Sequence, residues 1–210
     1  MKISYAITAC DEYAELEELL YFLMGRIGDK DEVRVVVDEN NVHPKVTELL
    51  YYVEQWEWNL NFEWYENPLN KNFSQQKNFI NSKCRGDFIF QIDADEKPHP
   101  SMLESLHPLL EGNKDIDAYW VPRINTVEGL TEEHIKKWGW QVNDRGWVNF
   151  PDFQMRIYKN NKKIKWTKPV HEQLVGYKQF THLPTDLEWC LNHNKKIERQ
   201  EKQNEFYNTI

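Results

Sequence analysis

The chain has 210 residues, of which 40% are hydrophobic, and a formal net charge of −8 at pH 7. A chain of this length and composition buries a substantial core, so we expect one compact unit over residues 1–210 rather than two independent domains. The negative charge argues against binding of nucleic acid through a broad basic surface. A negatively charged ligand therefore needs a local site or a metal ion.

The three cysteines, Cys10, Cys84 and Cys190, are widely spaced and form no CxxC pair. This pattern predicts neither a disulfide framework nor a structural zinc site, and it favours a reducing compartment. The N-terminal residues enter a strand-like stretch without the apolar core of a signal peptide, and no run approaches the roughly 20 apolar residues of a membrane span. The sequence therefore predicts a soluble, cytoplasmic protein.

The first half of the chain alternates between strand and helix patterns. Apolar and β-branched runs predict strands at residues 3–9, 33–37, 62–64 and 87–92, and helical spacing of apolar residues predicts helices after the first two. After the third strand, Ser74 is a candidate cap of a helix that runs to about Cys84 and is stopped by Gly86. Such alternation predicts right-handed crossovers, hence an α/β fold with a mostly parallel, Rossmann-like sheet and helices on both faces.

The second half has a different character after a predicted helix near residues 101–110. A strand is predicted at residues 118–124 and another at residues 153–158, and in the second apolar and polar residues alternate. A short helix is predicted near residues 131–138. The polar stretch 194–207 predicts a surface helix.

Polar or acidic clusters follow three of the predicted strands, at residues 10–12, 38–41 and 93–96. Ligands of such sheets bind beyond the carboxyl ends of the strands, so we expect these clusters to converge in space.

The third cluster follows the apolar run FIFQI with three carboxylates, Asp93, Asp95 and Glu96. Carboxylates this close together must be hydrated, hydrogen-bonded or neutralised by a cation. Mg²⁺ and Mn²⁺ prefer oxygen ligands and share a substrate's phosphates, so a metal site is one solution. The alternative is an acidic turn in which Asp95 or Glu96 caps the following helix.

Four further side chains are candidates for nucleotide binding. Asp38 ends the second predicted strand, where it accepts hydrogen bonds from a base or ribose unless it only caps its loop. Lys77 and Asn78 lie on the helix before the acidic strand and either reach the nucleotide or face solvent. Glu12 belongs to the first cluster, or only complements the dipole of the next helix.

A His-Glu pair, His171-Glu172, follows the stretch WTKPV. A carboxylate in such a turn acts as a general base where it reaches an acceptor hydroxyl. His193 precedes the last predicted helix, and its imidazole is a possible metal ligand. For these residues a purely structural role is the competing interpretation.

Nine tryptophans are many for this length, and several stand among polar neighbours in the second half: Trp138, Trp140, Trp147 and Trp166. Their amphipathic rings suit the faces of carbohydrates. Ordinary packing in the core and at its rim is the alternative.

Together these motifs resemble family 2 glycosyltransferases with the GT-A fold. The similarity rests on the opening strand and acidic loop, on the second-strand motif and on the acidic strand, which are residues 3–12, 35–39 and 86–96. Further segments are similar to the branch that includes lipopolysaccharide-core sugar transferases: residues 153–158, Trp166, residues 170–172 and residues 191–193. The sequences Cys-Asp-Glu and Asp-Glu-Asn-Asn depart from the Tyr-Asn-Glu type and the Asp-Asp-Gly-Ser type common in the family.

The resemblance implies an inverting sugar transfer from a nucleotide-diphosphate sugar, with a UDP-sugar favoured, to a glycan, lipid-linked or protein-linked acceptor. Residues 1–115 would form the nucleotide-sugar-binding half and residues 116–210 the acceptor-binding half. The implied cofactor is Mn²⁺ or Mg²⁺, held against the donor diphosphate. Its implied ligands are Asp93, Asp95, His193 and His171.

The resemblance also assigns the catalytic base. Glu172 is preferred for its place in the His-Glu motif, and Asp152 is the competing candidate. Arg156 orients the acceptor or a phosphate, unless it is a structural ion-pair partner.

Other function classes fit part of this pattern. A non-catalytic carbohydrate- or nucleotide-binding protein of the same fold would use the tryptophans equally well, although Asp93, Asp95 and Glu172 together favour catalysis. A metal-dependent nucleotidyltransferase shares a related architecture, but the sequence has no Gly-rich, basic phosphate loop near its start. A phosphatase with Asp93 as nucleophile is disfavoured because that strand is the fourth.

Overall fold

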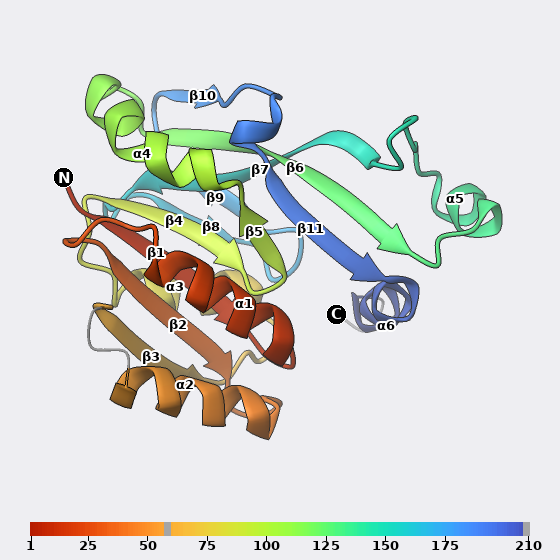
Figure 1. Cartoon of the computed structure of the whole chain (residues 1–210), viewed down its shortest axis with the longest axis horizontal. Coiled ribbons are helices and arrows are strands. Elements are labelled where there is room, and N and C mark those ends of the chain that lie inside the picture. Colours follow the sequence, from red (N-terminus) through yellow and green to blue (C-terminus); the bar gives the residue numbers. More distant parts are fainter. Residues whose placement is uncertain (57–59, 208–210) are drawn as a thin grey trace.

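A computed structural model describes residues 1–56 and 60–207 of the chain (Figure 1). The first half contains β1 (Ile3–Ala9), α1 (Tyr13–Met24), β2 (Glu32–Asp38), α2 (Pro44–Trp56), β3 (Phe62–Asn67), α3 (Phe73–Asn81), β4 (Phe88–Asp93), β5 (Glu96–Pro98) and α4 (Pro100–Gly112). The second half contains β6 (Ala118–Glu128), α5 (Glu132–Trp138), β7 (Val148–Lys159), β8 (Lys165–Thr167), β9 (Gln173–Val175), β10 (Phe180–His182), a 3₁₀ turn (Leu187–Trp189), β11 (Leu191–Lys196) and α6 (Ile197–Tyr207).

Within the described residues, nine strands form one twisted sheet in the order β3-β2-β1-β4-β7-β6-β11-β5, with β10 added beside β6. Strands β1 to β4 are mutually parallel where they pair, as the alternating pattern predicts. Strand β7 runs antiparallel to both β4 and β6, and it joins the two halves of the sheet. Strands β8 and β9 form a separate hairpin.

Two hydrophobic cores lie on opposite faces of the sheet because successive side chains of a strand alternate in direction. On one face, Ile7 of β1 packs in the same core as Leu16 and Leu20 of α1, which are fully buried along one helical stripe. Burial of each such leucine contributes about 1.5–3 kcal/mol. On the other face, Ala6 of β1 shares a core with Ile80 of α3. The predicted α/β fold with helices on both faces is confirmed.

A β-bulge interrupts the pairing of β6 with β7. Tyr119 lies opposite Ile157, but the next residue, Trp120, lies opposite Met155, so Arg156 has no partner on β6. A bulge re-aims the side chain of its extra residue. As a result Met155 belongs to the α3-side core and Ile157 to the α1-side core, although they are two positions apart.

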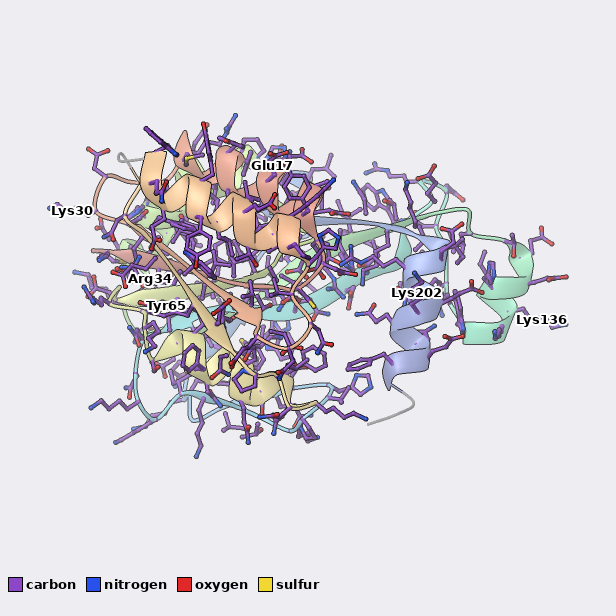
Figure 2. The ribbon with its side chains drawn as sticks, turned by 90° about the horizontal axis from the view of Figure 1, so that it is seen from below. Glu17, Lys30, Arg34, Tyr65, Lys136 and Lys202 are labelled. Atoms are coloured by element: carbon purple, nitrogen blue, oxygen red, sulfur yellow. The ribbon has the colours of Figure 1, made fainter. Side chains whose placement is uncertain are left out.

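Between β6 and β7, residues 129–147 extend beyond the sheet and carry α5; we call this segment the β6–β7 arm. Figure 1 shows the arm far from β1–β3, and Figure 2 shows α6, marked by Lys202, between the body of the molecule and α5, marked by Lys136. None of the helices in the described ranges has the length and apolar character required to cross a membrane.

The predicted surface helix over residues 194–207 is wrong at its start. Residues 191–196 instead form β11, which pairs with β6 on one side and β5 on the other. Its sequence, LNHNKK, has no apolar alternation, because only Leu191 enters a core whereas His193 and Lys195 line a cavity. Pairing with neighbouring strands, which the local pattern does not encode, decides its conformation.

Candidate active site

A cavity of about 1320 Å³ lies beyond the carboxyl ends of β1, β2 and β4. Side chains from all three predicted polar clusters line it, so the clusters converge as the strand ends require. The cavity wall also includes most of the other residues that the sequence singles out: Lys77, Asp152, Arg156, His171, Glu172 and His193.

Asp93 ends β4 with both carboxylate oxygens occupied. Thr8 Oγ1 donates a hydrogen bond to Oδ1 at 2.9 Å, and Arg156 Nη2 lies 2.6 Å from Oδ2. Burial by itself would raise the pKa of Asp93, but Arg156, with help from Lys77, holds it far below its ordinary value. Asp93 is therefore an anion at neutral pH.

Asp95 faces His193 across the cavity floor. His193 Nε2 lies 3.4 Å from Asp95 Oδ2, and His193 Nδ1 lies 2.6 Å from Asn125 Oδ1. Because the amide oxygen of Asn125 only accepts hydrogen bonds, it fixes the proton on Nδ1 and leaves Nε2 directed at Asp95. Burial opposes ionisation of Asp95, yet the neighbouring His193, together with Lys195, holds the carboxyl pKa well below the usual range.

Asp95 and His193 suit a divalent cation. Their facing atoms lie 3.4 Å apart, close enough for both to hold one ion; the carboxylate is a ligand that Mn²⁺ and Mg²⁺ both prefer, and an imidazole nitrogen is more usual for a transition metal such as Mn²⁺. In the described part of the chain, however, no three His, Cys, Asp or Glu side chains form a complete metal site. Further ligands would have to come from a substrate, whose phosphate oxygens fit that need.

The other two predicted metal ligands have different surroundings. Asp93 is held by Arg156, while His171 lies on the cavity wall in a turn, with a φ of 51°. The geometry therefore concentrates the metal-binding potential on Asp95 and His193.

Glu96 explains why three carboxylates crowd together after β4. Its buried Oε1 lies 2.7 Å from Arg123 Nη1 and 2.5 Å from Arg156 Nη2, and its Oε2 accepts a hydrogen bond from the Asp93 amide at 3.2 Å. One of the three is thus neutralised by arginines and turned away from any cation. Arg123, in a predicted strand of apolar residues, is the sequence signal that a buried acidic partner is needed.

The two candidate bases, Asp152 and Glu172, differ in how many hydrogen-bond donors and cations contact their carboxylates. Asp152 accepts hydrogen bonds from Arg123 Nε at 2.9 Å, Arg123 Nη2 at 2.6 Å, Asn125 Nδ2 at 2.9 Å and Gln154 Nε2 at 2.8 Å. Burial opposes ionisation of Asp152, but Arg123 lowers its pKa, which makes it a weak base.

Glu172 pairs with Lys77, whose Nζ lies 3.0 Å from the Glu172 Oε1. The Lys77 ammonium also lies 4.8 Å from the centre of the Trp166 ring, so an aromatic face and a carboxylate hold it together. Among the described residues, this ion pair orients Glu172 at the cavity wall through Oε1 and leaves Oε2 without an ion pair.

Asp38 and Glu12 shape the loops around the cavity. Asp38 accepts hydrogen bonds from the Leu69 amide at 3.0 Å and from Asn41 Nδ2 at 2.6 Å, which joins two neighbouring loops. Glu12 accepts a hydrogen bond from the Cys10 amide at 2.6 Å and pairs with Arg199 of α6. Burial raises the pKa of Glu12, although Arg199 opposes that effect.

Asn78 lies outside the cavity lining. Its amide exchanges two hydrogen bonds with the Trp166 backbone, donating to the carbonyl at 2.8 Å and accepting from the N–H at 2.9 Å. Both polar groups of its side chain are thereby used to dock β8 on α3. Its position gives no support to the prediction that it contacts a nucleotide.

Basic residues at the end of the chain complete the cavity, and sequence reasoning missed them. Lys195 Nζ lies 3.6 Å from Asp95 Oδ2, and Arg199 lies 3.5 Å from Asp11 in addition to its pair with Glu12. They occur in a polar segment whose composition is typical of a solvated surface. Only its position directly after His193 indicates that it belongs to the site.

Comparison with known proteins identifies the family to which this arrangement corresponds. The model of glycosyl transferase family 2 matches residues 4–178. This range includes every residue of the site described in this subsection except those of β11 and α6.

Solved structures share the fold at low sequence identity. S. aureus TarS 1-349 superposes with a TM-score of 0.64 at 14% identity over 92% of this chain, and TarS 1-349 in complex with UDP-GlcNAc does so with a TM-score of 0.64 at 16% identity over 93%. The chain spans 60% and 59% of those proteins. A mannosyltransferase, PcManGT from Pyrobaculum calidifontis in complex with GDP-Man and Mn²⁺, superposes with a TM-score of 0.51 at 17% identity, over 58% of this chain and 35% of its own.

Proposed function

Because the chain belongs to glycosyl transferase family 2, we propose that it transfers a sugar from a nucleotide-diphosphate sugar to an acceptor hydroxyl, with inversion at the anomeric carbon and with the help of Mn²⁺ or Mg²⁺. The family membership confirms the resemblance found in the sequence, whereas the likeness to lipopolysaccharide-core transferases stays a prediction. Residues 1–115 supply most of the donor side of this proposal, to which His193 and Lys195 are added, and the rest of residues 116–210 supply the acceptor side.

The observation that carries the proposal is the pair Asp95 and His193 beside the anionic Asp93, at the edge where three loops meet. Structures that share the fold bind UDP-GlcNAc in one case and GDP-Man with Mn²⁺ in another, which supports a nucleotide-sugar donor. Within that class we favour a UDP-sugar, as the sequence resemblance suggests.

In the proposed reaction, Asp95 and His193 hold the divalent cation. The bound cation supplies positive charge that offsets the negative charge developing on the leaving diphosphate. Lys195 lies next to Asp95 and adds a second positive charge at the same end of the cavity. Arg156 keeps Asp93 ionised and fixed in orientation.

On the acceptor side, Glu172 is the proposed base. It removes the proton from the acceptor hydroxyl as that oxygen attacks the anomeric carbon from the face opposite the leaving group. Lys77 orients its carboxylate through one oxygen and leaves the other oxygen available to the proton. Asp152 is the weaker candidate because four donors already occupy it.

Titration calorimetry tests the donor side. UDP, GDP and their common sugar conjugates are titrated into the wild type, Asp95→Ala and the control Asp29→Ala, with and without Mn²⁺. Asp29 is exposed, so its loss is expected to leave binding unchanged. We expect metal-dependent binding of one nucleotide in the wild type and the control, and its loss in Asp95→Ala. Equal metal-dependent affinity in all three proteins would overturn the assignment of Asp95.

Glu172→Gln tests the base with the nucleotide identified in that way. Donor affinity is expected to stay within about two-fold of the wild type while transfer falls at least about 10²-fold, the lower range for loss of a general base. Near-normal transfer would remove Glu172 from this role.

A further inference from the structure

The β6–β7 arm carries a group of aromatic rings that belongs to neither of the two cores. The Trp138 ring stacks on His134 with 5.1 Å between ring centres, and it contacts the Trp140 ring at 4.6 Å. Trp147 packs instead on Phe150 at 4.8 Å. Large rings that stand outside a core and remain partly exposed need another explanation than core packing.

Local hydrogen bonds fix the position of Trp140. Helix α5 ends at Gly139, whose φ of 65° is a left-handed conformation that glycine adopts without strain, and the Trp140 amide donates to the Ile135 carbonyl at 3.0 Å. The next residue, Gln141, exchanges two hydrogen bonds with Asn149: its amide donates to Asn149 Oδ1 at 2.9 Å, and its carbonyl accepts from the Asn149 amide at 2.7 Å. The backbone is thus fixed at Trp140 and at the residue after it, and the Trp140 indole packs against the Trp138 ring.

Trp140 lines the cavity that contains Asp95 and Glu172, whereas Trp138 and Trp147 do not. Asn149 and Val148 line the cavity beside it. The arm therefore brings one tryptophan side chain to the site, on the side formed by residues after 115. Trp138 packs against that side chain, and Trp147 packs on Phe150 instead.

We propose that Trp140 is a stacking platform for a pyranose ring of the acceptor, and hence that the acceptor is a glycan that extends along the β6–β7 arm. This inference rests on the proposed sugar transfer and specifies its acceptor class. The apolar face of a sugar ring stacks on an indole, while its hydroxyls bond to polar neighbours such as Asn149.

The charge of the arm argues for a glycan rather than an anionic membrane surface. An interfacial segment gains attraction from an excess of Lys and Arg. Between residues 129 and 147 the charges balance, with three acidic side chains (Glu132, Glu133, Asp144) and three basic ones (Lys136, Lys137, Arg145). A neutral glycan requires no such excess.

The test is binding of the fluorescently labelled full chain to an array of immobilised glycans, in the presence of UDP and Mn²⁺. Wild type, Trp140→Ala, Trp140→Phe and the matched control Trp147→Ala are compared, since Trp147 is a tryptophan of the same arm outside the cavity. We expect the wild type to select a set of glycans, Trp140→Ala to bind that set about ten-fold more weakly, and Trp147→Ala to stay within about two-fold. Trp140→Phe keeps an aromatic face and is expected to fall between the wild type and Trp140→Ala.

Equal binding by Trp140→Ala, equal losses in Trp140→Ala and Trp147→Ala, or no glycan retained by the wild type would each overturn the proposal. Flotation with phosphatidylcholine–phosphatidylglycerol vesicles is the second arm of the test, and flotation that depends on Trp140 would reassign the surface to lipid. Binding of UDP and of GDP by the wild type, with Mn²⁺, is measured separately. Failure to bind either nucleotide refutes the proposed function, whereas retention of a glycan through Trp140 still supports a sugar platform.

Discussion

Replacement of Glu96 by glutamine tests the ionic cluster under the site. Both oxygens of the wild-type carboxylate accept hydrogen bonds. Oε1 accepts from the guanidinium groups of Arg123 and Arg156, and Oε2 accepts from the Asp93 amide. Glutamine has nearly the same shape but only one acceptor oxygen. In either orientation its NH₂ group meets a donor, and the two arginines, Arg123 and Arg156, lose a shared negative charge in a buried setting.

The size of the effect follows from burial. The Glu96 side chain is completely buried and that of Arg156 is 4% exposed, so solvent does little to replace the lost pairing. Breaking a buried ion pair by changing one partner costs about 3–5 kcal/mol, and the retained shape places Glu96→Gln near about 3 kcal/mol. For a chain of this size that corresponds to a fall of about 6–12 °C in Tm.

Urea unfolding followed by tryptophan fluorescence measures this loss at pH 7. The matched control is Glu104→Gln, on the exposed side of α4, which is expected to stay within about 0.5 kcal/mol of the wild type. A change of less than about 1 kcal/mol for Glu96→Gln, with the control unaffected, would refute the argument that this carboxylate neutralises both arginines.

Three other perturbations address the surface, the backbone and α6. Lys159 holds the pKa of Asp117 at about 2, against roughly 4 in an unfolded chain, so this carboxylate contributes stability above pH 4 that is lost as the pH falls toward 2. The stability difference between wild type and Asp117→Asn is therefore expected to be about 1 kcal/mol at pH 5 and to shrink on acid titration; a constant difference would contradict this. Gly176→Ala places a Cβ 1.8 Å from the Lys163 carbonyl oxygen at a φ of 91°, and urea unfolding is expected to show a loss of at least about 2 kcal/mol, with wild-type stability as the contrary result. Arg199→Gln frees α6 from the loop after β1, so limited trypsin digestion is expected to cut near α6 several-fold faster, while an unchanged rate would show that other contacts hold the helix.

The position of the site could be predicted from the sequence because it depends on where parallel strands end. Asp38 and Asp93 follow strands whose apolar runs are unmistakable, and the crossover rule brings their carboxyl ends to one edge. Arg123 in a predicted strand signals a buried acid, but its identity as Glu96 could not be predicted, because it depends on the pairing of strands far apart in the sequence.

The bulge in β7 shows a second limit. Strict alternation over residues 153–158 places Met155 and Ile157 on one face, but the extra residue, Arg156, separates them onto two. Alternation describes a regular strand, and an irregular position in it depends on the partner strand. The same reason applies to β11, whose polar sequence becomes a strand only beside β6.

The ion pair between Glu12 and Arg199 also bears on the order in which this molecule forms. It joins positions 187 residues apart, and closing a loop of that length is entropically costly until the intervening structure has formed. During synthesis, strands β1 to β4 are complete long before Arg199 leaves the ribosome. Strands β1 to β4 therefore form before α6, and in a nascent chain the carboxylates at their sheet edge stay exposed until α6 packs beside them.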